Sequence, residues 1–183
     1  AVFLRIFGRI AGDLALASNR NDRLFMTWSD RNNGDLLFSL ANSSKANSSA
    51  EWQSPIDLPS PSEWTSSPDI LVDKAGTIVI VYAVPIYENR CIYMVQSGDN
   101  GATWSSPLTV FDAEAAGWVM VDHPEVALDG GGRLHILFTS YAGLIDRPAG
   151  LYYLQSSDGG LTWGVPDVVS EGSVVWSDIT TYG

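Results

Sequence analysis

The chain has 183 residues, of which 45% are hydrophobic and 17% are charged, a composition typical of one soluble globular domain. Its ten basic and twenty-one acidic residues give a net charge of −11, which disfavours nucleic acid and anionic membrane surfaces as partners. The longest apolar stretches, such as "TIVIVYAVPIY", fall short of the roughly twenty residues that a membrane-spanning helix needs. We therefore expect neither nucleic-acid binding nor membrane insertion.

The chain opens at Ala1 in the strand-like run "AVFLRIF" without an initiating methionine, which predicts that an upstream segment was removed or lies outside this sequence. "NSSKANSS", residues 42–49, contains two Asn-x-Ser frames, and a polar loop is favoured there over glycosylation. The single cysteine, Cys91, can form no intrachain disulfide and fits a small buried hydrophobe in a strand.

Two parts of the chain repeat each other at nearly fixed offsets. "SPDILVDKAGTIVIVYA" (67–83) aligns with "HPEVALDGGGRLHILFT" (123–139) at an offset of 56, and "IYMVQSGDNGATW" aligns with "LYYLQSSDGGLTW" at an offset of 59. The extra residues fall in "YAGLIDRPAG", where a loop tolerates an insertion. A more decayed first unit places Trp52 on Trp104, so three units are readable, and "VVWSDI" (174–179) resembles the start of a fourth.

Each unit has the pattern of four β-strands: an apolar run, a D-x-x-G turn, a second run, a variable loop, a third run and a short strand after the tryptophan. No stretch keeps a helical period beyond about a turn, and "DAEAAGW" (112–118) is the nearest to doing so. Four strands in about 55 residues predict an all-β propeller, whereas the WD type has a shorter period. The predicted single partial domain has blades at 9–58, 64–111 and 118–170, and 171–183 begin the next.

The frame Ser-x-Asp-x-Gly-x-Thr-Trp ends the third strand of two units. Its Asp carboxylate can accept hydrogen bonds from amides of its own turn, its Gly allows positive φ, and its Trp can wedge the hairpin against a neighbouring blade. We therefore predict that the frame holds the fold and performs no chemistry. Its residues are Ser97, Asp99, Gly101 and Trp104 in one copy and Ser156, Asp158, Gly160 and Trp163 in the other.

This frame resembles the Asp-box (BNR repeat), and a period in the fifties is similar to that of the sialidase (neuraminidase) superfamily of β-propellers. The resemblance covers about residues 9–170 and implies a six-bladed ring. About half of that ring would then come from remaining blades or from a second copy of the chain, because an exposed sheet edge invites pairing. The predicted location is extracellular or at the cell surface.

The resemblance also implies site residues in the first unit. Arg9-Ile10, with Ala11 in place of proline, matches the Arg-Ile-Pro signature whose arginine helps to clamp a sugar carboxylate. Asp30-Arg31 matches the D-x-R-like element, and Asp35 matches the general acid. The family's tyrosine nucleophile, its glutamate partner and two further arginines belong to later blades. The alternative is that Arg9 and Asp35 are ordinary strand and turn residues.

Ligands of propellers usually sit over the central channel, near the starts of the innermost strands and the loops between second and third strands. A tryptophan ahead of an inner strand, such as Trp64 or Trp118, is either a sugar platform or a wedge between blades. His123 beside Asp122 is either an acid–base pair or the start of a strand. The substrate-binding candidates are Asp30, Arg31, Trp64, Trp118, Asp122 and His123, and the loops also contribute Tyr87, Glu88, Arg90, Asp146 and Arg147.

Two histidines in the whole chain make a histidine-rich metal site improbable, and "DGGGR" lacks the lysine and helix of a phosphate-binding loop. We therefore expect no metal and no cofactor. Three functions stay open: a sialidase-like exo-glycosidase that acts on terminal sugars of glycans by acid–base chemistry, a non-catalytic propeller that binds glycans or proteins, and a structural or assembly module. A glycan or small sugar is the expected ligand, and whether the chain is an enzyme stays open.

Overall fold

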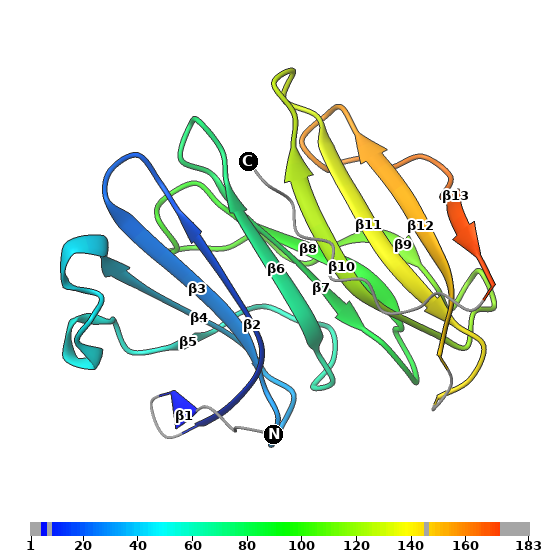
Figure 1. The fold of residues 1–183 in the computed structure, drawn as a ribbon, viewed down its shortest axis with the longest axis horizontal. Helices are drawn as coiled ribbons and strands as arrows, with labels where there is room; N and C mark the ends of the chain where they lie inside the picture. The colour runs from blue at the N-terminus through cyan, green and yellow to red at the C-terminus, as the bar shows by residue number, and fades with distance from the viewer. Residues whose placement is uncertain (1–4, 7–8, 145–146, 173–183) are drawn as a thin grey trace.

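The computed structural model describes residues 5–6, 9–144 and 147–172, which form a row of three antiparallel β-sheets (Figure 1). The first sheet contains β1 (Arg5–Ile6), β2 (Arg9–Ser18), β3 (Arg23–Asp30), β4 (Leu36–Asn42) and β5 (Ile56–Asp57). The second contains β6 (Ser66–Val72), β7 (Ile78–Val84), β8 (Cys91–Ser97) and β9 (Leu108–Asp112). The third contains β10 (Met120–Leu128), β11 (Leu134–Tyr141), β12 (Pro148–Ser156) and β13 (Asp167–Glu171). These sheets confirm the predicted all-β partial propeller.

The first sheet departs from the four-strand pattern in two places. The short strand β1 pairs with the start of β2 as a fifth strand, with Ile6 opposite Arg9. Between β4 and β5 the chain forms two 3₁₀ helices, η1 (Ser43–Lys45) and η2 (Ser49–Glu51), in the segment where the first repeat has lost its Asp and Gly. The segment 174–179, predicted to start a fourth blade, lies outside the described residues.

The second sheet is buried on both faces because β7 is a continuous apolar run. Ile80 and Tyr82 lie in a hydrophobic core shared with β3 and β4 of the first sheet. Val79 and Val81 point the other way, into a core shared with β11 of the third sheet. A slip of one residue would exchange the two sets, so packing on both sides fixes the register of the central sheet.

The inner strands β2, β6 and β10 each carry a bulge at an equivalent position. The residue in the bulge has positive φ in all three strands: 36° at Asp13, 46° at Ser67 and 51° at His123. Positive φ is uncommon for residues other than glycine. The repeat therefore extends to an unusual backbone conformation that the sequence pattern did not reveal.

A partly buried carboxylate joins two of these inner strands. Asp69 on β6 accepts hydrogen bonds from the backbone N–H of its neighbour Ile70 and of Val126 on β10, each at 2.8 Å. Burial raises the pKa of Asp69, and these two backbone N–H donors oppose that rise. The second and third sheets are thus connected by hydrogen bonding as well as by apolar packing.

The two Ser-x-Asp-x-Gly-x-Thr-Trp turns have the same internal hydrogen bonds. Ser97 Oγ donates to Asp99 Oδ1 at 2.8 Å, and the carboxylate of Asp99 accepts both the N–H and the hydroxyl of Thr103. Trp104 Nε1 donates to the carbonyl of Gly101 at 3.1 Å. The second turn repeats every one of these contacts with Ser156, Asp158, Thr162, Trp163 and Gly160.

The glycine of each turn is required by conformation and by space. Gly101 has φ +86°, and a Cβ placed on it would lie 2.4 Å from Phe38 of the first sheet. Gly160 has φ +88°, and its Cβ would lie 2.1 Å from the end of Met94 in the second sheet. Each turn therefore presses its glycine against the preceding sheet, which makes the frame part of the contact between blades.

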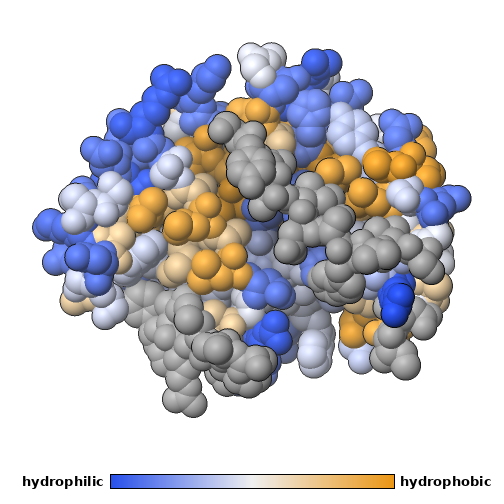
Figure 2. Space-filling model, in the orientation of Figure 1, coloured by the Kyte–Doolittle hydropathy of each residue, from blue (hydrophilic) through white to orange (hydrophobic). Residues whose placement is uncertain are grey.

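Exposed apolar side chains mark both ends of the row. Leu14 and Leu16 on β2 are exposed at one end, as are Val168 and Val169 on β13 at the other. Figure 2 shows hydrophobic residues gathered over β2 and over the third sheet in the orientation of Figure 1. A further blade or a second copy at either end stays a prediction.

The hydrogen bonds of the two turn carboxylates predict a pH dependence of stability. The hydroxyl and N–H of Thr103 and of Thr162 lower the pKa of Asp99 and of Asp158 to about 2. A carboxyl whose pKa is lowered by folding stabilises the fold above its ordinary pKa of 3.8, and that contribution is lost as pH falls towards 2. Asp99→Asn and Asp158→Asn should each lower Tm at pH 7 by about 2–6 °C.

Thermal melts from pH 7 to pH 2 measure this effect. The Tm difference between the parent and either variant should narrow from about pH 4 downwards, because protonation removes the same acceptor that the amide lacks. Asp22→Asn is the matched control, since Asp22 is an exposed turn residue whose carboxylate makes no hydrogen bond among the described residues. A Tm difference between parent and variant that stays constant from pH 7 to pH 2 would contradict the stabilising role of the two turn carboxylates.

Candidate functional site

The loops that follow β3 and β7 and the segments that enter β6 and β10 lie at one edge of the row, because antiparallel strands alternate in direction. The Ser-x-Asp turns lie at the opposite edge for the same reason. At the first edge two hollows meet at Ser62. The acidic cavity, about 290 Å³, is lined by Asp35, Leu36, Asp57, Leu58, Ser60, Pro61, Ser62 and Glu63. The aromatic groove, about 600 Å³, is lined by Ser62, Trp64, Tyr87, Glu88, Asn89 and Arg90.

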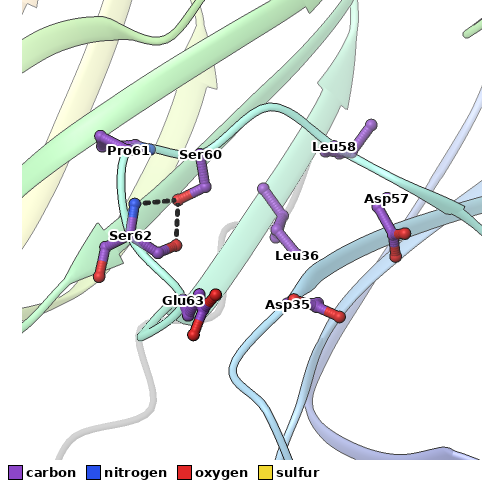
Figure 3. A pocket seen from close by; sticks show the side chains of 8 residues that line it. All are labelled: Asp35, Leu36, Asp57, Leu58, Ser60, Pro61, Ser62 and Glu63. Atoms are coloured by element: carbon purple, nitrogen blue, oxygen red, sulfur yellow. Dashed lines mark hydrogen bonds between the residues drawn. The ribbon is translucent and has the colours of Figure 1, made fainter.

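Three carboxylates surround the acidic cavity (Figure 3). Asp35 stands just before β4, and its carboxylate accepts a hydrogen bond from the side-chain amide of Asn33. Asp57 belongs to β5, and Glu63 lies in the connection between β5 and β6. Carboxylates on three separate segments thus line one small hollow, which gives it hydrogen-bond acceptors on several sides.

Gly34 allows the two loops around the acidic cavity to approach each other. Its φ is +73°, and a Cβ added there would lie 1.6 Å from the backbone oxygen of Glu63. The carbonyl of Gly34 also accepts hydrogen bonds from the N–H of Thr65, at 3.0 Å, and from its hydroxyl. The shape of the cavity therefore depends on the absence of a side chain at residue 34.

Two exposed aromatic side chains form one wall of the aromatic groove. Trp64 precedes β6, Tyr87 lies in the loop between β7 and β8, and each is 61% exposed. Their ring centroids are 6.2 Å apart and their planes meet at 63°. An edge-to-face pair of this kind leaves ring faces open to solvent, which is the arrangement that a stacking ligand uses.

The loop that carries Tyr87 is held in a strained conformation by residues around it. Tyr87 and Asn89 have φ of 67° and 61°, and such strain persists only where the surroundings enforce it. Arg90 Nη1 donates to the carbonyl of Tyr87 at 2.7 Å, and Glu114 Oε2 accepts the N–H of Asn89 at 2.7 Å. The hydroxyl of Tyr93 donates to the carbonyl of Asn89 at 3.1 Å. The backbone of the loop that carries Tyr87 is thus held by three side chains.

The polar residues at the inner-strand starts connect β6 to β10. Ser66 Oγ donates to Asp122 Oδ1 at 2.8 Å, and Asp122, only 8% exposed, also accepts the N–H of His123. His123 Nδ1 lies 3.2 Å from Ser67 Oγ. Asp122 and His123 therefore contact serines of the neighbouring strand and belong to the seam between the two sheets.

The other sequence-predicted residues lie in several environments. Asp30 is 2% exposed and accepts two hydrogen bonds from Asn32, whereas Arg31 forms an ion pair with Asp13 at 3.7 Å. Trp118 packs in a cluster with Phe111, Phe138 and Tyr152 between the second and third sheets.

Arg9 opens β2, but its side chain is outside the described part of the chain, so its approach to Asp35 stays a prediction. Asp146 is likewise outside it. Asp35 is the one lining residue of the acidic cavity that the sequence predicted, and the other two carboxylates of that lining, Asp57 and Glu63, were not predicted. Asp57 lies on β5 and Glu63 lies in the connection between β5 and β6, and the alignment of the units gave no signal for either as a site residue.

Within the described ranges, no group of three or more His, Cys, Asp and Glu side chains is arranged to hold a metal ion. The same ranges contain no helix long and apolar enough to cross a bilayer. Burial, as the largest cause, raises the pKa of the Cys91 thiol above its ordinary value.

The fold is that of β-propellers in solved structures. An α-L-arabinanase of Penicillium chrysogenum complexed with arabinobiose superposes with a TM-score of 0.65 at 14% identity, over 89% of this chain and 50% of its own. The Hadza microbial sialidase Hz136 superposes with a TM-score of 0.63 at 18% identity, over 85% of this chain and 37% of its own. A protein of unknown function from Dyadobacter fermentans superposes with a TM-score of 0.62 at 15% identity, over 84% of this chain and 53% of its own.

The chain thus spans about half or less of the length of these structures. No protein-family model matches the sequence, and a search of curated protein sequences finds no match. At these identities the likeness shows the fold, which is a partial β-propeller.

The close approach at Gly34 yields a prediction. Gly34→Ala should lower the free energy of unfolding by more than about 1 kcal/mol, because alanine is strained at positive φ and its methyl group would meet the backbone at Glu63. Denaturant melts measure the loss. Gly130→Ala is the control, since no heavy atom lies within 4 Å of its added Cβ. Equal stability of the two variants would contradict the tight contact.

Proposed function

We propose that this protein binds saccharides in the aromatic groove and the adjoining acidic cavity. The observation that carries the proposal is the exposed pair of Trp64 and Tyr87 beside hollows of about 600 and 290 Å³. A sugar ring has an apolar C–H face that can lie on an aromatic ring, and its hydroxyls are donors suited to carboxylate acceptors. The combined hollow has the size and the mixed lining of a small-ligand site.

The solved structures of the same fold support a saccharide ligand. Among them are a sialidase, an arabinanase complexed with arabinobiose and a polysaccharide lyase. Proteins that share this fold can differ in activity, so the groove of this chain carries the argument and the neighbours support it. The expected location outside the cell or at its surface, where glycans are displayed, belongs to the same proposal.

A glycosidase activity is the second candidate, and the lining of the acidic cavity favours it. Glycoside hydrolysis requires two carboxyl groups on either side of the bond that is cleaved. Asp35, Asp57 and Glu63 surround one cavity beside the aromatic groove. In this candidate Asp35 serves as the general acid and Arg9 contacts the sugar, as the sialidase resemblance implies. The remaining blades, or a second copy of the chain, would complete the catalytic site.

Removal of either exposed aromatic ring tests the binding proposal. Trp64→Ala and Tyr87→Ala should each raise Kd for an oligosaccharide by about 10-fold or more, because the stacking surface is lost. Both side chains are largely exposed, so Tm should change little. Titration calorimetry with xylotetraose, arabinotriose and galactotetraose measures the effect.

Leu161→Ala provides the matched control for these variants. Leu161 is 73% exposed and lies in the second Ser-x-Asp turn, at the edge opposite the groove. Its loss should leave Kd unchanged. If both aromatic variants bind the oligosaccharides with the Kd of the parent, the aromatic groove is not the binding site.

Amide replacement of Asp35 tests the hydrolytic candidate. Asp35→Asn cannot donate a proton to a leaving group, so release of reducing ends should fall by about 100-fold or more while saccharide binding persists. The rate is measured beside Asp57→Asn and beside the parent. An unchanged rate in Asp35→Asn would overturn the hydrolytic candidate and leave the binding proposal standing.

A further inference from the structure

Arg90 is the single cation among the residues that line the aromatic groove, so its role bears on which sugars fit there. Arginine binds a carboxylate best through two parallel N–H donors. In this structure Arg90 Nε donates to the carbonyl of Trp118 at 2.7 Å, and Nη1 donates to the carbonyl of Tyr87 at 2.7 Å. Two of the five N–H donors of the guanidinium are therefore engaged by backbone carbonyls, and one of them is the Nε donor that a side-on carboxylate would use.

These two hydrogen bonds give Arg90 a positioning role. They tie Tyr87, whose backbone is held at positive φ, to the segment that leads into β10. The N–H of Glu114 donates to the carbonyl of Arg90 at 3.1 Å, and Glu114 Oε2 accepts the N–H of Asn89. The loop and the entering segment are thus connected in both directions, which holds the backbone that carries the Tyr87 ring beside Trp64.

The remaining polar groups of the groove suit hydroxyls better than anions. Glu88 is an exposed carboxylate in the groove, and Glu63 lies in the adjoining cavity. Carboxylates accept hydrogen bonds from sugar hydroxyls, whereas they repel a sugar carboxylate held close by. Ser62 and Asn89 add neutral polar groups to the lining.

We propose that the aromatic groove takes a neutral sugar ring, stacked on Trp64 or Tyr87, and that Arg90 positions Tyr87 instead of clamping a sugar carboxylate. This inference rests on the saccharide-binding function proposed above and narrows it to a substrate class. It departs from the acidic terminal sugar that the sialidase resemblance implies, because the arginine at this groove is held by backbone carbonyls.

Matched neutral and acidic probes test the inference. Calorimetric titrations of the protein use xylotetraose, arabinotriose and galactotetraose as neutral probes, and tetragalacturonate and 3′-sialyllactose as acidic probes. The expected result is that the Kd of at least one neutral probe is about 10-fold or more lower than the Kd of either acidic probe. Trp64→Ala should remove that binding.

The positioning role of Arg90 is tested by a double-mutant cycle with Tyr87. Arg90→Gln and Tyr87→Ala should each weaken binding of the neutral probe, and the double variant should bind no more weakly than Tyr87→Ala, because both changes act through one ring. Independent losses that multiply in the double variant would overturn the positioning role. If Arg90→Gln does not fold, Arg90→Lys replaces it, since lysine cannot bridge the two carbonyls in the same geometry.

The outcomes separate this inference from the proposed function. If an acidic probe binds most tightly and depends on Trp64 and Arg90, the neutral-sugar inference falls and saccharide binding in the groove stands. If no probe binds, or if binding is indifferent to Trp64 and Tyr87, the inference and the proposed function fall together. Binding of a neutral probe that depends on Trp64 and is coupled between Arg90 and Tyr87 supports both.

Discussion

Burial of both faces of the second sheet is the constraint on which the rest of this structure depends. Ile80 and Tyr82 require apolar partners on one side of β7, and Val79 and Val81 require them on the other. The first and third sheets supply those partners, so they must lie on either side of the second sheet. This arrangement brings the inner strands together and places their entering segments along one edge, where the aromatic groove and the acidic cavity form.

Hydrogen bonds along the inner strands then fix how the second and third sheets meet. Hydrophobic packing is not directional, whereas the bonds from Val126 to Asp69 and from Ser66 to Asp122 have defined geometry. The bulges at Ser67 and His123 bring those two side chains within 3.2 Å. Strained backbone at equivalent positions is therefore used to join neighbouring strands, and these contacts set the seam between the second and third sheets.

The sequence predicted the fold because the fold is repetitive. Alternation, the D-x-x-G turns and the Ser-x-Asp frame all recur, so each unit supports the interpretation of the others. Even the decayed first unit keeps one contact, since Trp52 Nε1 donates to the carbonyl of Ala46 at 3.0 Å, much as Trp104 donates to Gly101. The site was less predictable, because the alignment of the units marks neither Asp57 nor Glu63 as a shared feature.

The two tryptophans ahead of the inner strands show what periodicity leaves open. Trp64 and Trp118 occupy equivalent places in the repeat, yet Trp118 packs against Phe111 and Tyr152, whereas Trp64 is exposed beside Tyr87. Their neighbours come from strands distant in sequence. The repeat alone therefore could not tell which tryptophan packs as a wedge between blades and which is exposed as a platform for a sugar. The aromatic wall also depends on Arg90, whose guanidinium donates hydrogen bonds to the backbone carbonyls of both Tyr87 and Trp118. The groove is therefore a property of adjoining sheets, which no single blade could form.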